Sequence, residues 1–94
     1  MIKPDKAARL IVDVREPDEF EARHVAGSVN IPLGAIEEGA EMLEGLASSA
    51  PIVVYCQSGS RAAAAQQRLR ALGYSNVTNG INQQQVESSI RSTN

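Results

Sequence analysis

The chain has 94 residues, 43% of them hydrophobic, which is enough for one compact domain and too few for two. Nine basic and eleven acidic residues give a net charge of -2, and no lysine/arginine cluster is present, so we expect no nucleic-acid partner. No segment approaches the ~20 consecutive apolar residues that span a bilayer, so we expect no membrane span.

The start of the chain, MIKPDKAARLIVDV, lacks a long apolar segment and a cleavage site of small residues, so no signal peptide is visible. We expect a cytoplasmic protein, or a periplasmic one if a signal peptide has been removed. The single cysteine, Cys56, cannot form an intramolecular disulfide, and with the single His24 it falls short of a structural zinc site. We expect neither a metal nor a cofactor.

Short apolar runs alternate with helical stretches along the first part of the chain. Leu10 to Val14 is apolar except for Asp13, which predicts a buried strand. Pro17 to Arg23 predicts a short acidic helix with proline at its first position and Phe20 as its apolar anchor. Ser28 to Ile31 predicts a second strand, which a proline stops.

The same alternation continues in the middle of the chain. From Leu33 to Leu46, apolar residues recur at helical spacing with glutamates between them, which predicts an amphipathic helix with a break near Gly39. Ile52 to Tyr55 follows Pro51 as a continuous apolar run and predicts a further buried strand.

Arg61 to Leu72 predicts a helix that ends at Gly73. Asn76 to Thr78 predicts a last short strand, and Ile81 to Arg91 predicts a weaker closing helix. The positions expected to be buried on the first of these helices are Ala62, Ala65, Leu69 and Leu72. Strands that alternate with helices predict an α/β fold with a central parallel sheet and helices on both faces. Ligands of such folds bind beyond the carboxyl ends of the strands, and Cys56 follows the strand expected at the centre.

The stretch VVYCQSGSRAAAA, residues 53–65, places the cysteine on a short polar loop between a strand and an alanine-rich helix. Backbone N–H groups of a tight turn there can converge on an anion, and the helix dipole adds positive potential. Both favour the thiolate of Cys56 over the thiol, while Gly59 permits an unusual backbone angle and Arg61 supplies a planar cation suited to an oxyanion. The alternative is an inert, half-buried cysteine beside a surface arginine. The combination of features favours a reactive cysteine.

Two segments resemble the single-domain rhodanese (thiosulfate sulfurtransferase) family, most closely its small phage-shock-protein E type. They are LIVDVREPDEFEARHVAGSVNIPL (Leu10 to Leu33) and IVVYCQSGSRAAAAQQRLRALGYSNV (Ile52 to Val77). The first carries Asp-Val-Arg-Glu followed by His-Val-x-Gly-Ser-x-Asn-Ile-Pro, and the second carries a Cys-x4-Arg loop before an alanine-rich helix. The resemblance is strongest over residues 10–81 and implies a single rhodanese-like domain over residues 1–94.

The resemblance implies that Cys56 is catalytic. It would take the sulfane sulfur from a donor such as thiosulfate, and the resulting persulfide would be attacked by cyanide or a thiol, with a protein thiol as a further candidate acceptor. The loop amides would hold the outer sulfur of the persulfide, and Arg61 would bind the anionic tail of the donor. The implied substrate-binding residues are Arg61, Gln57, Ser58, Gly59 and Ser60.

One segment departs from the family pattern. Family members usually carry a Gly-Gly pair after the last strand, often followed by tryptophan, and this segment helps to wall the active-site pocket. Here it reads Thr78-Asn79-Gly80-Ile81, with one glycine and no tryptophan. The departure bears on pocket enclosure and donor specificity, and not on the nucleophile.

Two other residues could serve the site or only the fold. Asp13 is a carboxylate within an apolar strand and needs a partner if it is buried. It could brace the active-site loop, but bonds to backbone amides or to Arg15 are the favoured interpretation. His24 has no carboxylate at a spacing that would orient it as a general base, so we expect a structural or exposed histidine.

Two rival functions remain. A cysteine phosphatase or arsenate reductase of related fold carries a Cys-x5-Arg loop, one residue longer than the spacing from Cys56 to Arg61, and a phosphatase usually needs a carboxylic acid that this sequence does not identify. A rhodanese-like regulatory or binding module commonly lacks the cysteine, which this chain keeps. Sulfur transfer is therefore the favoured function.

Overall fold

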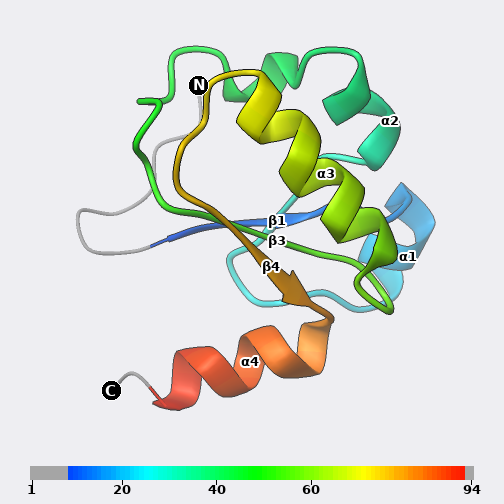
Figure 1. The fold of residues 1–94 in the computed structure, drawn as a ribbon. Helices are drawn as coiled ribbons and strands as arrows, with labels where there is room; N and C mark the ends of the chain where they lie inside the picture. Colours follow the sequence, from blue (N-terminus) through cyan, green and yellow to red (C-terminus); the bar gives the residue numbers. More distant parts are fainter. Residues whose placement is uncertain (1–8, 93–94) are drawn as a thin grey trace.

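The computed structural model describes residues 9–92, so residues 1–8 and 93–94 of the predicted domain lie outside the described residues. The elements in chain order are β1 (Leu10–Asp13), α1 (Pro17–Ala22), β2 (Val29–Asn30), α2 (Leu33–Glu37), the 3-10 helix η1 (Glu41–Leu43), β3 (Ile52–Tyr55), α3 (Ser60–Ala71), β4 (Val77–Ile81) and α4 (Gln83–Ser92). The strands form a four-stranded sheet in the order β2-β1-β3-β4, and every pairing is parallel (Figure 1). The predicted α/β fold with a central parallel sheet is confirmed.

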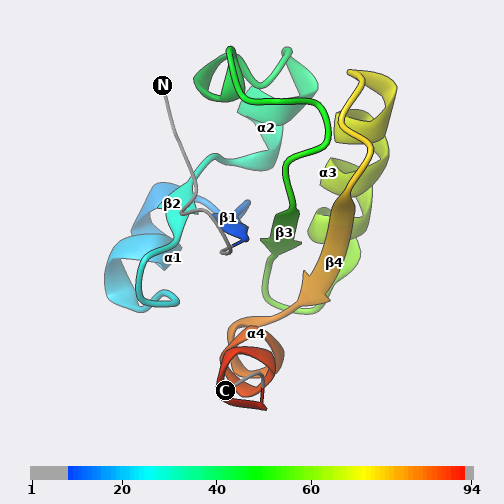
Figure 2. The ribbon, with the colours of Figure 1, turned by 90° about the vertical axis from the view of Figure 1, so that its left-hand side faces the viewer.

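Helices cover both faces of the sheet, as predicted. The helices α2 and α3 lie on one face and α4 lies on the other (Figure 2). Alternate residues of β3 serve the two sides: Ile52 and Val54 belong to the core beneath α2 and α3, whereas Val53 and Tyr55 pack with Val86 of α4. Because a strand turns successive side chains to opposite faces, a continuous apolar run such as β3 needs cover on both sides. Among residues 9–92, no helix is long and apolar enough to cross a membrane.

The register of the sheet brings the ends of two central strands together. Asp13, the last residue of β1, lies opposite Tyr55, the last residue of β3. The segments that follow, which begin at Val14 and Cys56, therefore leave the sheet at the same edge. This edge is where ligands of parallel sheets bind.

The amphipathic stretch from Leu33 to Leu46 is not one helix. It divides into α2 and η1, because Gly39 and Ala40 have positive φ angles of 123° and 51°. Consecutive residues in the left-handed region cannot continue a right-handed helix. The break expected near Gly39 is therefore confirmed.

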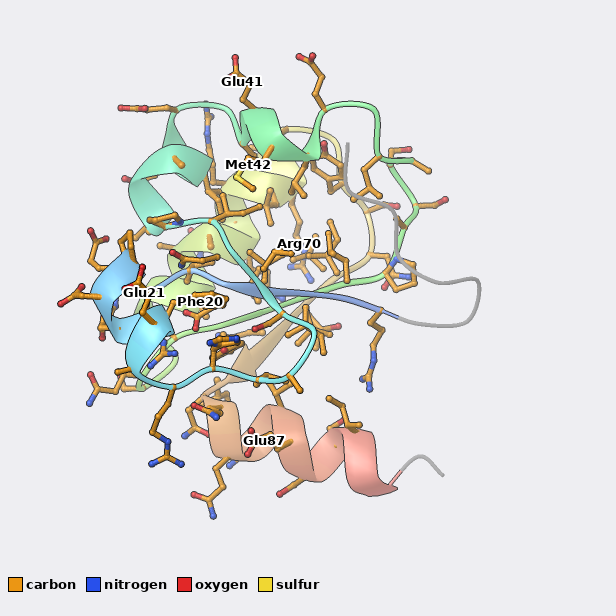
Figure 3. All side chains as sticks on the ribbon, turned by 180° about the vertical axis from the view of Figure 1, so that it is seen from behind. Phe20, Glu21, Glu41, Met42, Arg70 and Glu87 are labelled. Atoms are coloured by element: carbon orange, nitrogen blue, oxygen red, sulfur yellow. The ribbon has the colours of Figure 1, made fainter. Side chains whose placement is uncertain are left out.

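Two packing predictions need correction. Leu72 was expected to be buried but is 37% exposed, because α3 ends at Ala71 and Leu72 only caps the helix. Phe20 of α1, labelled in Figure 3, was expected to anchor this helix. The helix, however, contains no fully buried residue. Phe20 instead stacks on His24, with ring centroids 3.7 Å apart. His24 is exposed, as expected, and its Nδ1 lies 2.7 Å from the carbonyl oxygen of Phe20.

The segment that departs from the family pattern forms the end of β4, which is longer than the predicted strand. A Cβ atom at Gly80 would lie 2.6 Å from Val86 Cγ2 and 2.8 Å from Val53 Cγ1, so only glycine lets α4 pack this close to the sheet. Ile81 has a φ of 73°, a left-handed conformation that glycine adopts readily and a β-branched residue resists. Both positions thus favour glycine, the first because of space and the second because of backbone conformation. The closing helix α4 begins only at Gln83, because this strained residue still belongs to the strand.

Candidate active site

Cys56 follows the last residue of β3 and is only 2% exposed. Its backbone N–H donates to the carbonyl oxygen of Ile81, 3.1 Å away, so β4 still holds the chain at this point. The loop then turns into α3 through Gly59, whose φ of 99° lies in the left-handed region. The nucleophile predicted from sequence therefore sits at the carboxyl end of a central strand, below the N-terminus of a helix.

The loop points backbone N–H groups at the sulfur of Cys56. The backbone N–H of Gly59 donates to Sγ at an N–S distance of 3.0 Å, and the backbone N–H of Ala62 donates to the same atom at 3.3 Å. Burial by itself raises the pKa of the Cys56 thiol, but hydrogen bonds from Ala62, Gly59, Ser58 and Arg61 outweigh it, and the pKa is lowered. The loop is built to hold negative charge on sulfur.

The other predicted loop residues differ in exposure. Gln57, Ser58 and Ser60 are exposed, and Gly59 is buried. A Cβ atom at position 59 would lie 3.3 Å from Ile81 Cγ2, so the loop and the end of β4 are in close contact. Asn79 strengthens this contact: its side chain donates to the carbonyl oxygen of Gly59 and accepts from the N–H of Ile81.

Arg61 is engaged in an ion pair. Its Nη1 lies 2.8 Å from Glu19 Oε1 and its Nη2 lies 3.1 Å from Oε2, a two-point contact between α3 and α1. The guanidinium of Arg61, together with the backbone N–H of Glu16, lowers the pKa of Glu19 to about 2. Glu19 also completes the capping box of α1 with Glu16. The predicted donor-binding cation is thus held by a carboxylate 42 residues earlier in the chain.

Asp13 is fully buried and bonded to Arg15, as the favoured interpretation predicted. Its Oδ1 accepts hydrogen bonds from the backbone N–H and from Nε of Arg15, each with a donor–acceptor distance of 2.9 Å. Its Oδ2 accepts from Nη2 of Arg15 at a distance of 2.6 Å. The guanidinium of Arg15 also lies 5.5 Å from the centroid of the Tyr55 ring. Asp13 therefore fixes an arginine beside the strand end that carries Cys56.

A cleft of about 410 Å³ opens over Cys56. A cavity of this size exceeds what thiosulfate needs and lies in the usual range of small-molecule sites. Its lining residues are Arg15, Arg23, Cys56, Gln57, Asn82, Gln83, Gln84 and Glu87. They come from the ends of β1 and β3, the segment after α1 and the first turns of α4.

The rhodanese-like domain family matches residues 1–82 of this chain. The chain belongs to this family. Its relatives include the thiosulfate sulfurtransferase PspE of Escherichia coli K12, which is 35% identical over 81 residues, with 81% of this chain and 72% of the relative covered. A mitochondrial protein of Schizosaccharomyces pombe, provisionally named a thiosulfate sulfurtransferase, is 40% identical over 80 residues, but the match covers 74% of this chain and only 56% of that protein.

Solved structures give the same placement. A rhodanese with anions from E. coli superposes with a TM-score of 0.74 at 29% identity, covering 83% of this chain and 91% of that one. The rhodanese assignment made from the two sequence segments is confirmed, as is the likeness to the phage-shock-protein E type.

Several residues of the cleft in this rhodanese-like domain were not identified from the sequence. Arg23 was treated only as the end of a helix, and the polar run from Asn82 to Gln85 was assigned no role. Arg15 was considered only as a partner of Asp13. A signal for Arg15 was present, because residues that follow neighbouring parallel strands meet at one edge. For Arg23 and Asn82 the sequence carried no such signal.

The amide contacts predict a reactive thiolate. We expect the rate of Cys56 alkylation by iodoacetamide to rise with pH to a midpoint below the free-thiol value of about 8.5. The reason is that the loop amides stabilise the charged form in the folded state. A quenched assay of alkylation between about pH 5 and about pH 10 measures the midpoint. A midpoint at or above the free-thiol value would contradict the anion-binding role of the loop.

Proposed function

We propose that this rhodanese transfers sulfane sulfur from thiosulfate, or a related donor, to a thiophilic acceptor through a persulfide on Cys56. The observation that carries the proposal is the contact of Sγ with the amides of Gly59 and Ala62 beneath a cleft that Cys56 lines. Amides aimed at a sulfur atom stabilise a thiolate before the reaction and can hold the outer sulfur of a persulfide after it.

The reaction has two balanced steps. In the first, the Cys56 thiolate attacks the outer sulfur of thiosulfate, a new S–S bond forms, and the old S–S bond breaks so that sulfite leaves with the electron pair. In the second, cyanide or a thiolate attacks the outer sulfur of the persulfide. The acceptor leaves as thiocyanate or as a persulfide, and the Cys56 thiolate is regenerated. Neither step needs a further oxidant or reductant.

The rival functions are less well supported. Four residues separate Cys56 from Arg61, one fewer than in the Cys-x5-Arg loop of cysteine phosphatases and arsenate reductases. The family to which the chain belongs also includes named sulfurtransferases. A regulatory module without activity would not need amides directed at its cysteine. Mass spectrometry after incubation with thiosulfate tests the proposal: we expect one added sulfur atom on Cys56, and an unmodified cysteine would favour a binding module.

Arg61 remains a predicted donor-binding residue, but its pair with Glu19 must open first. We therefore expect Glu19→Gln to lower the KM for thiosulfate several-fold, because a neutral amide holds the guanidinium less tightly. Arg61→Ala should slow persulfide formation by roughly one to two decades, the value of a lost bond between charged groups. Discharge of a persulfide already formed should suffer less, because no donor anion is then bound. Single-turnover kinetics of the two half-reactions measures both effects.

The stability of Arg61 variants distinguishes a donor-binding Arg61 from one that only braces α1 against α3. The pair is partly exposed, with side-chain exposures of 34% and 29%, so its loss should cost only about 1 kcal/mol or less. Because the pKa of Glu19 is lowered from 4.5 to about 2, this contribution is present above about pH 4.5 and is lost as the pH falls toward 2. Equal losses in both half-reactions together with a clearly lower melting temperature would make Arg61 only a brace between α1 and α3.

A further inference from the structure

Within residues 9–92, two arginines line the cleft over Cys56, and Arg61 is not one of them. The lining cations are Arg15 and Arg23, whereas Arg61 faces Glu19. A donor such as thiosulfate carries its charge on the group that does not react, so that group must find a cation when the outer sulfur meets Cys56. The question is which arginine is available for it.

Arg15 is already committed to protein partners. Its Nε and Nη2 donate to Asp13, and Nη2 also donates to the carbonyl oxygen of Arg23 at a distance of 2.6 Å. Its side chain is only 12% exposed. Arg15 therefore serves mainly to hold the neighbouring backbone in place.

The backbone around Arg23 is fixed on each side. The carbonyl oxygen of Arg23 accepts the bond from Arg15, and the N–H of Arg23 donates to the carbonyl oxygen of Glu19 at a distance of 3.3 Å. Two residues later, the N–H of Val25 donates to the hydroxyl oxygen of Tyr55 at a distance of 3.0 Å. Tyr55 directly precedes Cys56 in the chain. The position of Arg23 is thus tied to the strand that carries the nucleophile.

The side chain of Arg23, in contrast, is not engaged. It makes no hydrogen bond or ion pair with the described side chains or backbone of residues 9–92, and the residue is exposed at the cleft. A fixed backbone with an unpaired guanidinium is the arrangement that suits recognition of a small anion.

We propose that Arg23 binds the anionic part of the sulfur donor in the cleft over Cys56. This inference rests on the proposed sulfur transfer and names a specificity-determining residue for it. The ligand class is a small anion with a transferable sulfur, such as a thiosulfate or a thiosulfonate. Arg61 can add a second contact only after its pair with Glu19 opens, whereas Arg23 has no carboxylate partner to give up among the described residues.

Among the described residues that line the cleft, one is a carboxylate, and it disfavours an anion. Glu87, on α4 (Figure 3), lines the cleft and accepts a hydrogen bond of 2.9 Å from Gln83 Nε2. Its charge repels an incoming anion. Neutralising Glu87 should therefore act in the direction opposite to neutralising Arg23.

Alkylation by two reagents tests the charge next to Cys56 without sulfur chemistry. Iodoacetate is an anion and iodoacetamide is neutral, and both react with the same thiolate, so the ratio of their rate constants cancels any change in the pKa of Cys56. For Arg23→Gln we expect this ratio to fall about fivefold, the factor that one unit charge at contact distance gives in water. For Glu87→Gln we expect it to rise. Arg68→Gln, which removes an exposed arginine from α3, should leave it unchanged.

Persulfide formation from thiosulfate provides the second arm. Arg23→Gln should slow this step about fivefold or more and leave discharge of a formed persulfide at the wild-type rate. If the wild-type protein takes no sulfur from thiosulfate, the proposed function fails, while the alkylation ratio still decides whether Arg23 is an anion contact. A ratio for Arg23→Gln equal to that of Arg68→Gln would overturn the inference.

Discussion

Replacing Cys56 by serine should abolish sulfur transfer from thiosulfate to cyanide and leave the fold intact. A hydroxyl group cannot form the persulfide, because the chemistry needs a sulfur nucleophile. Serine is close to cysteine in size, and its oxygen can accept the N–H groups of Gly59 and Ala62 that now point at Sγ. Thiocyanate production measures the transfer, and a thermal melt monitors the fold.

A relocated thiol provides the control for this variant. Ser49 is exposed in the turn before β3, away from the loop amides. Adding Ser49→Cys to the Cys56→Ser protein restores a thiol but not its surroundings, so activity should stay absent. Substantial activity in Cys56→Ser alone would refute the nucleophile assignment, and activity regained with Ser49→Cys would show that the loop is dispensable.

Replacing Asp13 by alanine should destabilise the protein by about 3–5 kcal/mol, the usual cost of removing one partner from a buried ion pair. Asp13 is fully buried, and Arg15, at 12% side-chain exposure, would lose the carboxylate that pairs with its charge. Since small domains have an unfolding free energy of about 5–15 kcal/mol, a large part of the stability would be lost. Urea unfolding measures the change, with the exposed Asp18→Ala as the matched control.

A double variant separates stability from positioning. Asp13→Ala combined with Arg15→Met removes both charges and should recover much of the lost stability, because an apolar pair often replaces a buried ion pair at little cost. It also removes the Arg15 charge from the cleft and the bond from Arg15 to the carbonyl oxygen of Arg23, so the ratio of the iodoacetate to the iodoacetamide rate constant at Cys56 should be lower than in the wild-type protein. A cost for Asp13→Ala as small as that for Asp18→Ala would contradict the role of this pair.

The nucleophile and its loop could be predicted from sequence because their determinants are contiguous. An apolar run, a short polar loop with Gly59 and an alanine-rich helix specify a strand–turn–helix unit whose amides must surround Cys56. The pair of Asp13 and Arg15 could be predicted for the same reason, since the two residues are two positions apart. The alternation of such units also determined the parallel sheet with helices on both faces.

The partners of the arginines were decided only by the tertiary structure. Arg61 could have met a donor, the loop or any of several glutamates, and only the packing of α1 beside α3 brings it to Glu19. Arg23 lies far from Cys56 in sequence, and the bond between Val25 and Tyr55 brings its segment to the cleft.

The same holds for the far wall of the cleft. The sequence shows one glycine where the family usually has two, but it does not show why. In the structure, Gly80 leaves room for Val86 of α4. Ile81 has a left-handed backbone conformation, and the hydrogen bond from the N–H of Cys56 to the carbonyl oxygen of Ile81 helps to hold it. Local patterns determine which elements form and what chemistry a contiguous loop can support. The side chains that select the ligand come from segments distant in sequence, and only the register and packing of the sheet bring them together.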